Sequence, residues 1–263
     1  MSKPRPCYTL RPLVEAVKLL EAELAPHLPT KLLHPHEKAT DARLLALEVL
    51  RILHKHPYRT VWFTLMVQNF YPELPCYTQI YLRLERLGAV IAQWTQAASV
   101  RNPQNQVVVD SMPLAVCRAK RRFSCKVRFA ALGFSTQGKV YGFKAHVWAT
   151  PQGQPVHSLI QPANRHDYAV ACELNRRYAD FGGPQVIGDK AYVSDGIITP
   201  PKKNAVRTDR YKPEYTAYRL ALERSFSWLV RTGLRMSQVK TLATLNTRWA
   251  FALLAHRLHF AYP

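Results

Sequence analysis

Apolar residues recur at the spacing of helices through the first hundred residues. Leu13, Val17, Leu20 and Leu24 share one face of the first run, which ends before two prolines. Three further runs with this spacing cover about residues 41–53, 60–70 and 78–94. The pattern predicts four short helices that form a helical domain over residues 1–100.

The pattern changes after about residue 97, where the polar stretch SVRNPQNQ precedes a region with strand character. The segments VVVD, AALGFS, KVYGFKAHVWAT and PVHSLIQP are predicted strands, and the turns TQG and PQG make the last three an antiparallel meander. A helix at residues 167–181 and a short buried strand in QVIGDKAY follow, and residues 214–229 and 242–260 are helical again. This order predicts an α/β domain over residues 101–263.

Two of the predicted strands end in a carboxylate. Asp110 follows the run VVV, with Pro113 expected to break the strand, and Asp189 follows QVIG. A carboxylate at the end of a core strand costs desolvation energy unless a cation or a hydrogen bond compensates it. Ligands of open sheets collect beyond strand ends, so two such strands can bring both carboxylates to one site, and Glu223 of the following helix can add a third. The structural alternatives are a capped turn at Pro113 and a pairing of Glu223 with Arg219 one helical turn earlier.

The charge of the chain favours a polyanionic partner. Lys and Arg number 37 against 17 Asp and Glu, which gives a net charge of +20. The sequence has no apolar run of about 20 residues and no apolar signal core at its start, so a soluble intracellular protein with no membrane partner is expected. Five scattered cysteines without a Cys-x-x-Cys pair indicate reduced thiols and argue against zinc.

Two groups of basic residues are candidates for contacts with phosphates. The first, after the strand of Asp110, comprises Arg118, Lys120, Arg121, Arg122, Lys126 and Arg128. The second, before the helix at 214–229, comprises Lys202, Lys203, Arg207, Arg210 and Lys212. A solvated charged loop is the alternative for each group. Lys144 and His146 alternate onto one face of their predicted strand, so Lys144 would meet a phosphate if that face lines the site.

Five segments in order carry a resemblance to a known family. VVVDSMPLAVC, YGFKAHVWATPQG, QPANRHD, IGDKAY and LERSFSWL resemble the catalytic domain of the acidic-triad (DDE) transposases encoded by bacterial insertion sequences. The resemblance covers about residues 105–260, and LPCYTQIYLRLERL resembles the end of the helical N-terminal region of such proteins. It implies a ribonuclease-H-like catalytic domain, with a mixed sheet flanked by helices, at residues 101–263. It also implies an all-α domain at residues 1–100 that binds DNA ends or supports dimerisation.

The family is known for cutting and rejoining DNA with divalent metal held by three carboxylates. Residue by residue, these correspond to Asp110, Asp189 and Glu223. The resemblance therefore implies a transposase that binds terminal inverted repeats, cleaves DNA at the element's ends with two Mg²⁺ ions, for which Mn²⁺ substitutes, and joins the 3′-hydroxyl to target DNA. A homodimer on DNA, no small-molecule cofactor and a bacterial, cytoplasmic, nucleoid-associated location are expected with it.

The sequence departs from the family in two places. The segment between GDKAYVSDG and IITPPKKNA is shorter than in such transposases, where helical chain usually intervenes. Val230 stands where related proteins have a lysine, so Arg219 and Arg231 are the candidates for phosphate contacts around Glu223. Two alternative functions follow: a nuclease of the same fold that does not rejoin DNA, and a catalytically impaired DNA-binding derivative of a transposase.

Overall fold

The chain forms two compact units. The computed structural model describes residues 8, 11–28, 39–100, 106–135, 138–179, 185–192, 196–201, 211–234 and 239–260. Unit 1 comprises Met1–Trp94, Arg231–Gly233 and Ala243–Pro263, and unit 2 comprises Thr95–Val230 and Leu234–Leu242. The two units are therefore divided inside a helix, a few residues before the boundary expected at residue 100.

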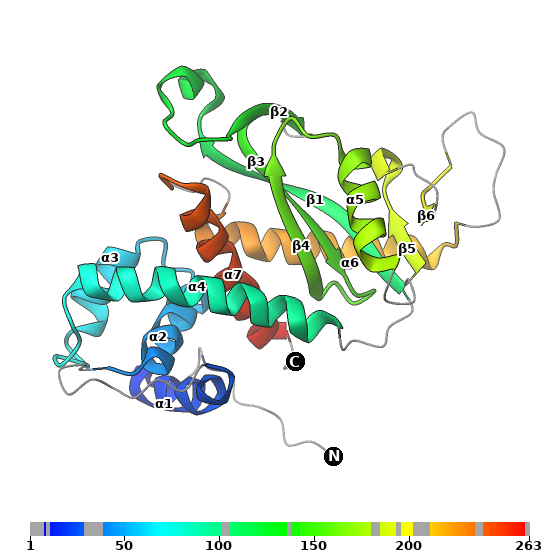
Figure 1. Cartoon of the computed structure of the whole chain (residues 1–263). Coiled ribbons are helices and arrows are strands. Elements are labelled where there is room, and N and C mark those ends of the chain that lie inside the picture. Colours follow the sequence, from blue (N-terminus) through cyan, green and yellow to red (C-terminus); the bar gives the residue numbers. More distant parts are fainter. Residues whose placement is uncertain are drawn as a thin grey trace, which may run out of the picture. The chain divides into compact units, whose positions relative to one another are not determined.

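Helices dominate the described part of unit 1 (Figure 1). They are α1 (Leu13–Leu24), the 3₁₀ turn η2 (Ala25–His27), α2 (Asp41–Leu53), α3 (Arg59–Val61), the π-helix η3 (Trp62–Val67), α4 (Tyr77–Val100) and α7 (Leu242–Phe260). The four runs predicted from apolar spacing are helical, although the third is a short α-helix that widens into a π-helix. Thr40 caps α2, because its hydroxyl oxygen accepts the N–H of Arg43 at 3.0 Å.

Helix α7, which the sequence assigned to the second domain, packs with the helices of unit 1. Thr247 lies directly against Gly88 of α4, where an added Cβ would be 2.5 Å from the threonine methyl group. The guanidinium of Arg59 lies 5.9 Å from the ring centroid of Phe251. Apolar spacing alone could not show this, because it identifies a buried helical face but not its partner.

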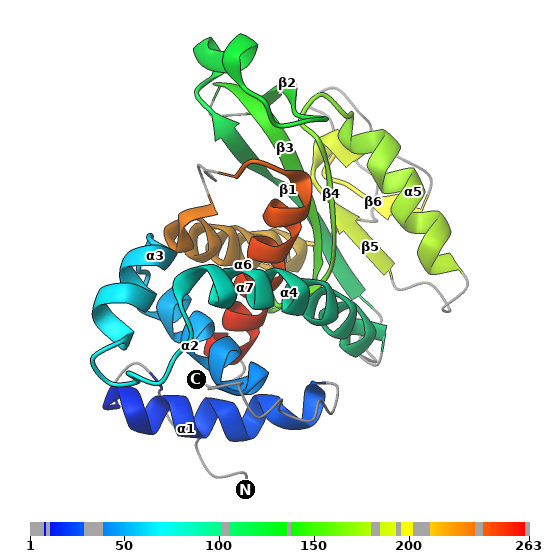
Figure 2. The same cartoon turned by 60° about the vertical axis from the view of Figure 1, so that its left-hand side comes forward.

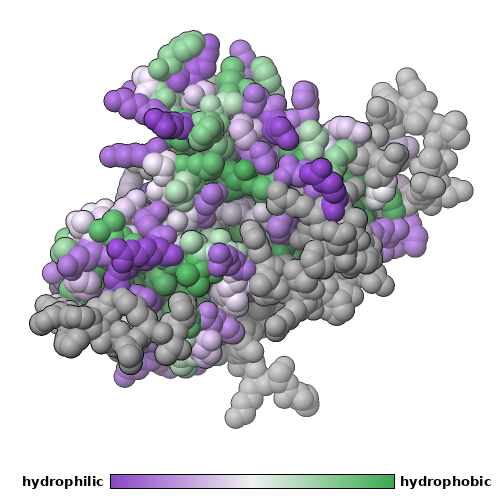
Figure 3. Space-filling model, in the orientation of Figure 1, coloured by the Kyte–Doolittle hydropathy of each residue, from purple (hydrophilic) through white to green (hydrophobic). Residues whose placement is uncertain are grey.

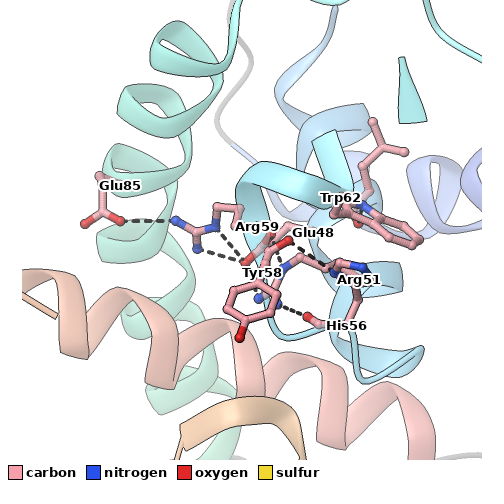
Figure 4. Close-up of polar contacts among 8 residues, drawn as sticks. Glu48, Arg51, His56, Tyr58, Arg59, Trp62 and Glu85 are labelled. Atoms are coloured by element: carbon pink, nitrogen blue, oxygen red, sulfur yellow. Dashed lines mark hydrogen bonds and ion pairs between the residues drawn. The ribbon is translucent and has the colours of Figure 1, made fainter. Parts of the chain in front are cut away.

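A buried ionic cluster joins α2 to α3 in unit 1 (Figure 4). Glu48 has no exposed surface, and its carboxylate accepts hydrogen bonds from Arg51 at 2.9 Å and from Arg59 at 2.8 Å. Arg59 also reaches Glu85 of α4 at 3.4 Å. Burial by itself would raise the pKa of Glu48, but the two guanidinium groups outweigh it and lower that pKa to about 2. The cluster thus compensates a charge that would otherwise be costly in the core.

Unit 2 contains a six-stranded mixed sheet. The strands are β1 (Gln106–Cys117), β2 (Ala131–Ser135), β3 (Gly138–Ala149), β4 (Pro155–Pro162), β5 (Gln185–Gly188) and β6 (Ile197–Ile198). Their order is β2-β3-β1-β5-β6, and β4 also pairs with β3. The pairings of β3 with β1, β2 and β4 are antiparallel, which confirms the predicted meander, whereas β1–β5 and β5–β6 are parallel.

Strand β1 does not end where the sequence predicted. It continues through Asp110 and Pro113 to Cys117, and Pro113 is paired with Lys144 of β3. The expected break at Pro113 is therefore wrong. The ladder with β5 stops at Val109, so no strand in the described part of the chain pairs with that edge of β1 at the proline. Proline has no backbone N–H, and it is tolerated in a strand where no neighbouring strand needs a hydrogen bond from that position.

Helices cover both faces of this sheet. Helix α5 (Asp167–Ala179) packs Val170 and Ala171 against Val107 and Val109 of β1 in one buried cluster. Helix α6 (Glu214–Leu229) contacts β1 and lies on the opposite face (Figures 1 and 2). The result is an α/β unit with a mixed sheet between helices, as predicted. Among the described helices, none has the length and apolar character needed to cross a bilayer.

Candidate active site

Two aspartates lie side by side at the carboxyl end of the parallel ladder. The last pair between β1 and β5 is Val109 and Gly188, and Asp110 and Asp189 are the next residue of each chain segment. Residues in register on parallel strands direct their side chains to the same face. Successive side chains of β1 point to opposite faces of the sheet. Val109 packs on the face that α5 covers, so the side chain of Asp110 points to the face that α6 covers.

Each aspartate makes one local hydrogen bond. The backbone N–H of Ser111 donates to Oδ1 of Asp110 at 2.7 Å, and the N–H of Ala191 donates to Oδ1 of Asp189 at 2.8 Å. The second bond holds the start of the 3₁₀ turn η5 (Lys190–Tyr192). A capped turn at Pro113, the structural alternative for Asp110, does not occur because Pro113 lies within a strand.

Glu223 and Arg219 approach these aspartates from α6. They are four residues apart and therefore share one helical face. Asp189 and Glu223 both act electrostatically on Asp110 and raise its pKa, whereas Arg219 acts on it in the opposite direction. Asp189, Glu223 and Arg219 are thus all within electrostatic range of Asp110.

Asp110 is a carboxylate whose charge is not compensated. Burial, followed by the charges of Asp189 and Glu223, raises the pKa of Asp110 to about 7, and the hydrogen bond from Ser111 and the charge of Arg219 counter this only in part. A fixed cation beside the carboxylate would remove this penalty. The raised pKa therefore reflects a buried carboxylate beside two others, with Arg219 as the opposing positive charge.

The donor set suits a hard divalent cation, but the geometry is open. Carboxylate oxygens are the ligands that Mg²⁺ prefers in proteins. Within the described ranges, however, no three His, Cys, Asp or Glu side chains are close enough together to hold a metal ion. The three carboxylates are thus electrostatic neighbours rather than a preformed ligand cluster. Of the three, Glu223 has an exposed side chain.

The helix that carries Glu223 is anchored to the turn between β3 and β4. The hydroxyl of Ser225 donates to the carbonyl of Gly153 at 2.7 Å and lies 3.3 Å from the carbonyl of Ala221. Glu223 lies midway between these two contact residues of α6. The contact with the turn therefore fixes the position and the rotation of α6 around Glu223.

The opposite face of the sheet holds a separate polar network. Lys144, His146 and Trp148 are paired with Pro113, Ser111 and Val109, so their side chains share the α5 face. The ammonium of Lys144 lies 3.1 Å from Oδ1 of Asp167, at the start of α5. The register consequently places Lys144, a predicted phosphate contact, on the face of the sheet away from Asp110.

The same network ties the two aspartate segments together. Nδ1 of the fully buried His146 lies 3.0 Å from the hydroxyl of Tyr192. The same hydroxyl forms a hydrogen bond with the side chain of Ser111. Burial and the nearby Lys144 lower the pKa of His146 to about 3, so the ring is neutral. Tyr192 stands three residues after Asp189, and Ser111 follows Asp110. Sequence reasoning missed both residues, although their positions next to the aspartates were a signal.

The predicted basic contacts fall into three places. In the first group, five side chains are exposed and Arg122 lies 4.3 Å from the ring centroid of Phe123; the exposed ones are Arg118, Lys120, Arg121, Lys126 and Arg128. Arg231 is exposed on the π-helix η6 (Val230–Leu234) and belongs to unit 1. The residues Lys202, Lys203, Arg207 and Arg210 lie outside the described ranges.

Comparison with known proteins agrees with the motifs. Residues 101–210 match the family described as "Transposase DDE domain". The match includes Asp110 and Asp189 and ends before Glu223. No curated protein and no solved structure matches the chain. Transposases of the DDE type cleave DNA and in general use divalent metal ions. The match over residues 101–210 supports a DDE transposase, as the resemblance of the sequence motifs predicted.

Proposed function

We propose that the chain is the DNA transposase of a bacterial insertion sequence. It binds the terminal inverted repeats, hydrolyses the DNA at the element's ends and joins the freed 3′-hydroxyl to target DNA. The observation that carries this proposal is the position of Asp110 and Asp189, each one residue beyond the last pair of the β1–β5 ladder, with Glu223 acting electrostatically on Asp110. A carboxylate triad of this kind serves phosphodiester cleavage.

The proposed fold of the catalytic domain is ribonuclease-H-like. The supporting observation is a sheet in which β1 has an antiparallel neighbour, β3, on one side and a parallel neighbour, β5, on the other. Residues 1–100 are the proposed region for binding DNA ends or for dimerisation, and a homodimer on DNA is proposed because two ends must be paired. The proposed location is the bacterial nucleoid in the cytoplasm.

Asp110, Asp189 and Glu223 are the proposed ligands of two Mg²⁺ ions, with Mn²⁺ as a substitute. When bound, such ions supply a polarised attacking water and stabilise the leaving oxygen. Asp110 and Asp189 are held on the sheet by their backbone hydrogen bonds, whereas Glu223 is exposed on a helix anchored at Ser225. A rotamer change of Glu223, rather than a movement of strands, is therefore the proposed step that gathers the three carboxylates.

The basic residues after β1 are the proposed contacts with the DNA backbone. Five of the six are exposed, and no acidic residue lies between Arg118 and Arg128 to neutralise them. Arg219 is a further proposed contact, since its charge lies beside the carboxylates where a scissile phosphate would sit. Lys202, Lys203 and Arg231 remain predicted contacts. Lys144 is engaged by Asp167, so a phosphate contact would require that ion pair to open.

A cleavage assay on the DNA that flanks the coding sequence tests this function. The wild type is expected to nick at the element's ends with Mg²⁺ and not with a chelator, and Asp189→Asn is expected to bind the ends without nicking. Glu214→Gln, an exposed carboxylate in the first turn of α6, is the matched control and should cleave normally. Nicking by Asp189→Asn at the wild-type rate would contradict the assignment.

Product analysis separates the transposase from its two alternatives. Supplying end DNA and a target plasmid together should give joined products. Cleavage without joining would indicate a nuclease of the same fold, and binding of the ends without any metal-dependent cleavage would indicate a DNA-binding derivative.

A further inference from the structure

The connection between β1 and β2 forms a basic arm, residues 118–130 (Figure 1). Its first half is the 3₁₀ helix η4 (Ala119–Ser124), in which the N–H of Arg121 donates to the carbonyl of Arg118 at 2.8 Å. Its second half is fixed by Val127, whose side chain is only 7% exposed. The arm therefore has a defined backbone and one apolar anchor.

Two phenylalanines on this arm face solvent. Phe123 is 87% exposed and Phe129 is 73% exposed, the two highest values among the large hydrophobic side chains of the described residues. Figure 3 shows hydrophobic and hydrophilic side chains mixed at the top of the molecule, over this connection. Isolated exposed apolar residues are common. Here two exposed phenyl rings lie in one seven-residue stretch of a cationic segment, so they form a distinct surface.

The backbone holds one ring in an unusual conformation. Phe129 has φ of 65°, one of two positive values among the described non-glycine residues. This left-handed conformation is unfavourable for a bulky side chain and persists only where the surrounding structure imposes it. Here it follows the buried Val127, so the chain reverses its direction between an inward side chain and an outward ring.

We propose that the basic arm binds unpaired DNA bases. Phe123 and Phe129 offer ring faces on which bases stack, and the surrounding arginines and lysines neutralise the phosphates that accompany those bases. Stacking on aromatic side chains within a positively charged surface is how proteins hold single-stranded nucleic acid without sequence preference. The inference deepens the proposed function, because a cut or opened element end supplies the unpaired nucleotides.

Charge decides between DNA and a second copy of the chain as the occupant. The arm has six cationic side chains and no acidic one. Two such arms would repel each other, and the whole chain carries a charge of +20, so self-association through the rings would bring like charges together. A single strand has both a negative backbone and exposed base faces, whereas the bases of an intact duplex are already stacked on one another.

Binding to two matched DNA probes tests the proposal. The first is a blunt duplex, and the second is the same duplex with a 3′ overhang of about six nucleotides. Fluorescence anisotropy at one fixed salt concentration should show tighter binding of the overhang by the wild type. Phe123→Ala and Phe129→Ala should each weaken overhang binding about tenfold and leave blunt-duplex binding within about twofold. Phe134→Ala, an exposed ring of β2 outside the arm, is the matched control and should change neither.

A gain of signal complements these losses. Phe123→Trp offers a larger aromatic face for stacking, so this variant should keep overhang binding. The fluorescence of its added indole should be quenched by the overhang probe but not by the blunt one. Equal affinity of the alanine variants and the wild type for the overhang would overturn the proposal. So would an equal loss on both probes, or an altered oligomeric state with unchanged DNA binding.

The same preparations distinguish this inference from the proposed function. Mg²⁺-dependent cleavage by a wild type whose overhang binding does not depend on the two rings would overturn the arm proposal and leave the transposase proposal standing. Ring-dependent overhang binding by a wild type that never cleaves would support the arm proposal and overturn the transposase proposal.

Discussion

Gly153 lies so close to Ala221 that an added Cβ would be 2.5 Å from the alanine carbonyl oxygen. Gly153 also has φ of +84°, a conformation that L side chains rarely adopt. The contact joins the β3–β4 turn to α6 two residues before Glu223. A glycine in this turn thereby allows the close approach of α6 that positions Glu223, the third proposed metal ligand.

Gly153→Ala should therefore damage the site as well as the fold. The left-handed conformation costs about 1 kcal/mol with any Cβ, and displacement of α6 adds to it. Gly138→Ala is a matched control, since Gly138 has φ of +109° but nothing lies within 4 Å of its added Cβ. Urea unfolding should show the larger loss for Gly153→Ala, and only this variant should lose DNA cleavage. Equal losses of stability and activity in both variants would refute the anchoring role.

Glu48→Gln should destabilise unit 1 severely. The substitution leaves Arg51 and Arg59 buried without their carboxylate, a change that costs about 3–5 kcal/mol. Glu85→Gln removes one 3.4 Å contact at a less buried position and should cost about 1 kcal/mol or less. Denaturant unfolding of both variants measures the difference.

The pH dependence of the same cluster has a defined sign. The pKa of Glu48 is lowered to about 2, so its stabilising charge is fully present above its ordinary value of 4.5 and is lost as pH falls toward 2. Glu48→Gln should remove this part of the acid denaturation profile. An unchanged profile would show that the carboxylate is not the group responsible.

His146 predicts a second acid-sensitive step. Its pKa is lowered from 6.5 to about 3, so the folded state holds the neutral ring while the unfolded state takes up a proton. Stability should consequently fall as pH drops from about 6.5 toward 3, by up to about 1.4 kcal/mol per pH unit. His146→Gln keeps a polar group near Tyr192 but cannot titrate, so its stability should depend less steeply on pH. A slope equal to that of the wild type would contradict the buried neutral ring.

The basic arm should also contribute to the salt dependence of DNA binding. Arg121 and Lys126 are both exposed, and replacing both with Gln should reduce the slope of log K against log salt by about 1.8 if each neutralises one phosphate. Lys139→Gln, an exposed cation of β3, is the control. Anisotropy titrations at several salt concentrations measure the slope, and an equal effect of the control would remove the arm from the DNA contact.

Local patterns in the sequence predicted most elements of the fold. Apolar spacing and turn residues sufficed for α1, α2 and the β2–β3–β4 meander, because such contacts are short-range. Asp110 and Asp189 stood out because a carboxylate interrupts an apolar run. The register that brings them together is a pairing between segments almost eighty residues apart, which no local pattern encodes.

Other features depended on information that the local sequence lacks. Pro113 reads as a strand breaker unless the end of the neighbouring ladder is known. Lys144 could be placed on a strand face, but whether that face holds α5 or Asp110 depends on the register with β1. The partner of α7 and the two-residue strand β6 are likewise fixed by tertiary contacts alone.

Titration with Mn²⁺, followed by electron paramagnetic resonance with duplex DNA bound, tests most directly whether the three carboxylates form one metal site. The wild type should bind two ions in excess of the DNA alone, and Asp110→Asn, Asp189→Asn and Glu223→Gln should each lose that binding. Glu214→Gln, on the same helix as Glu223, should retain it. Wild-type binding that survives all three substitutions, or no binding by the wild type at all, would contradict the account.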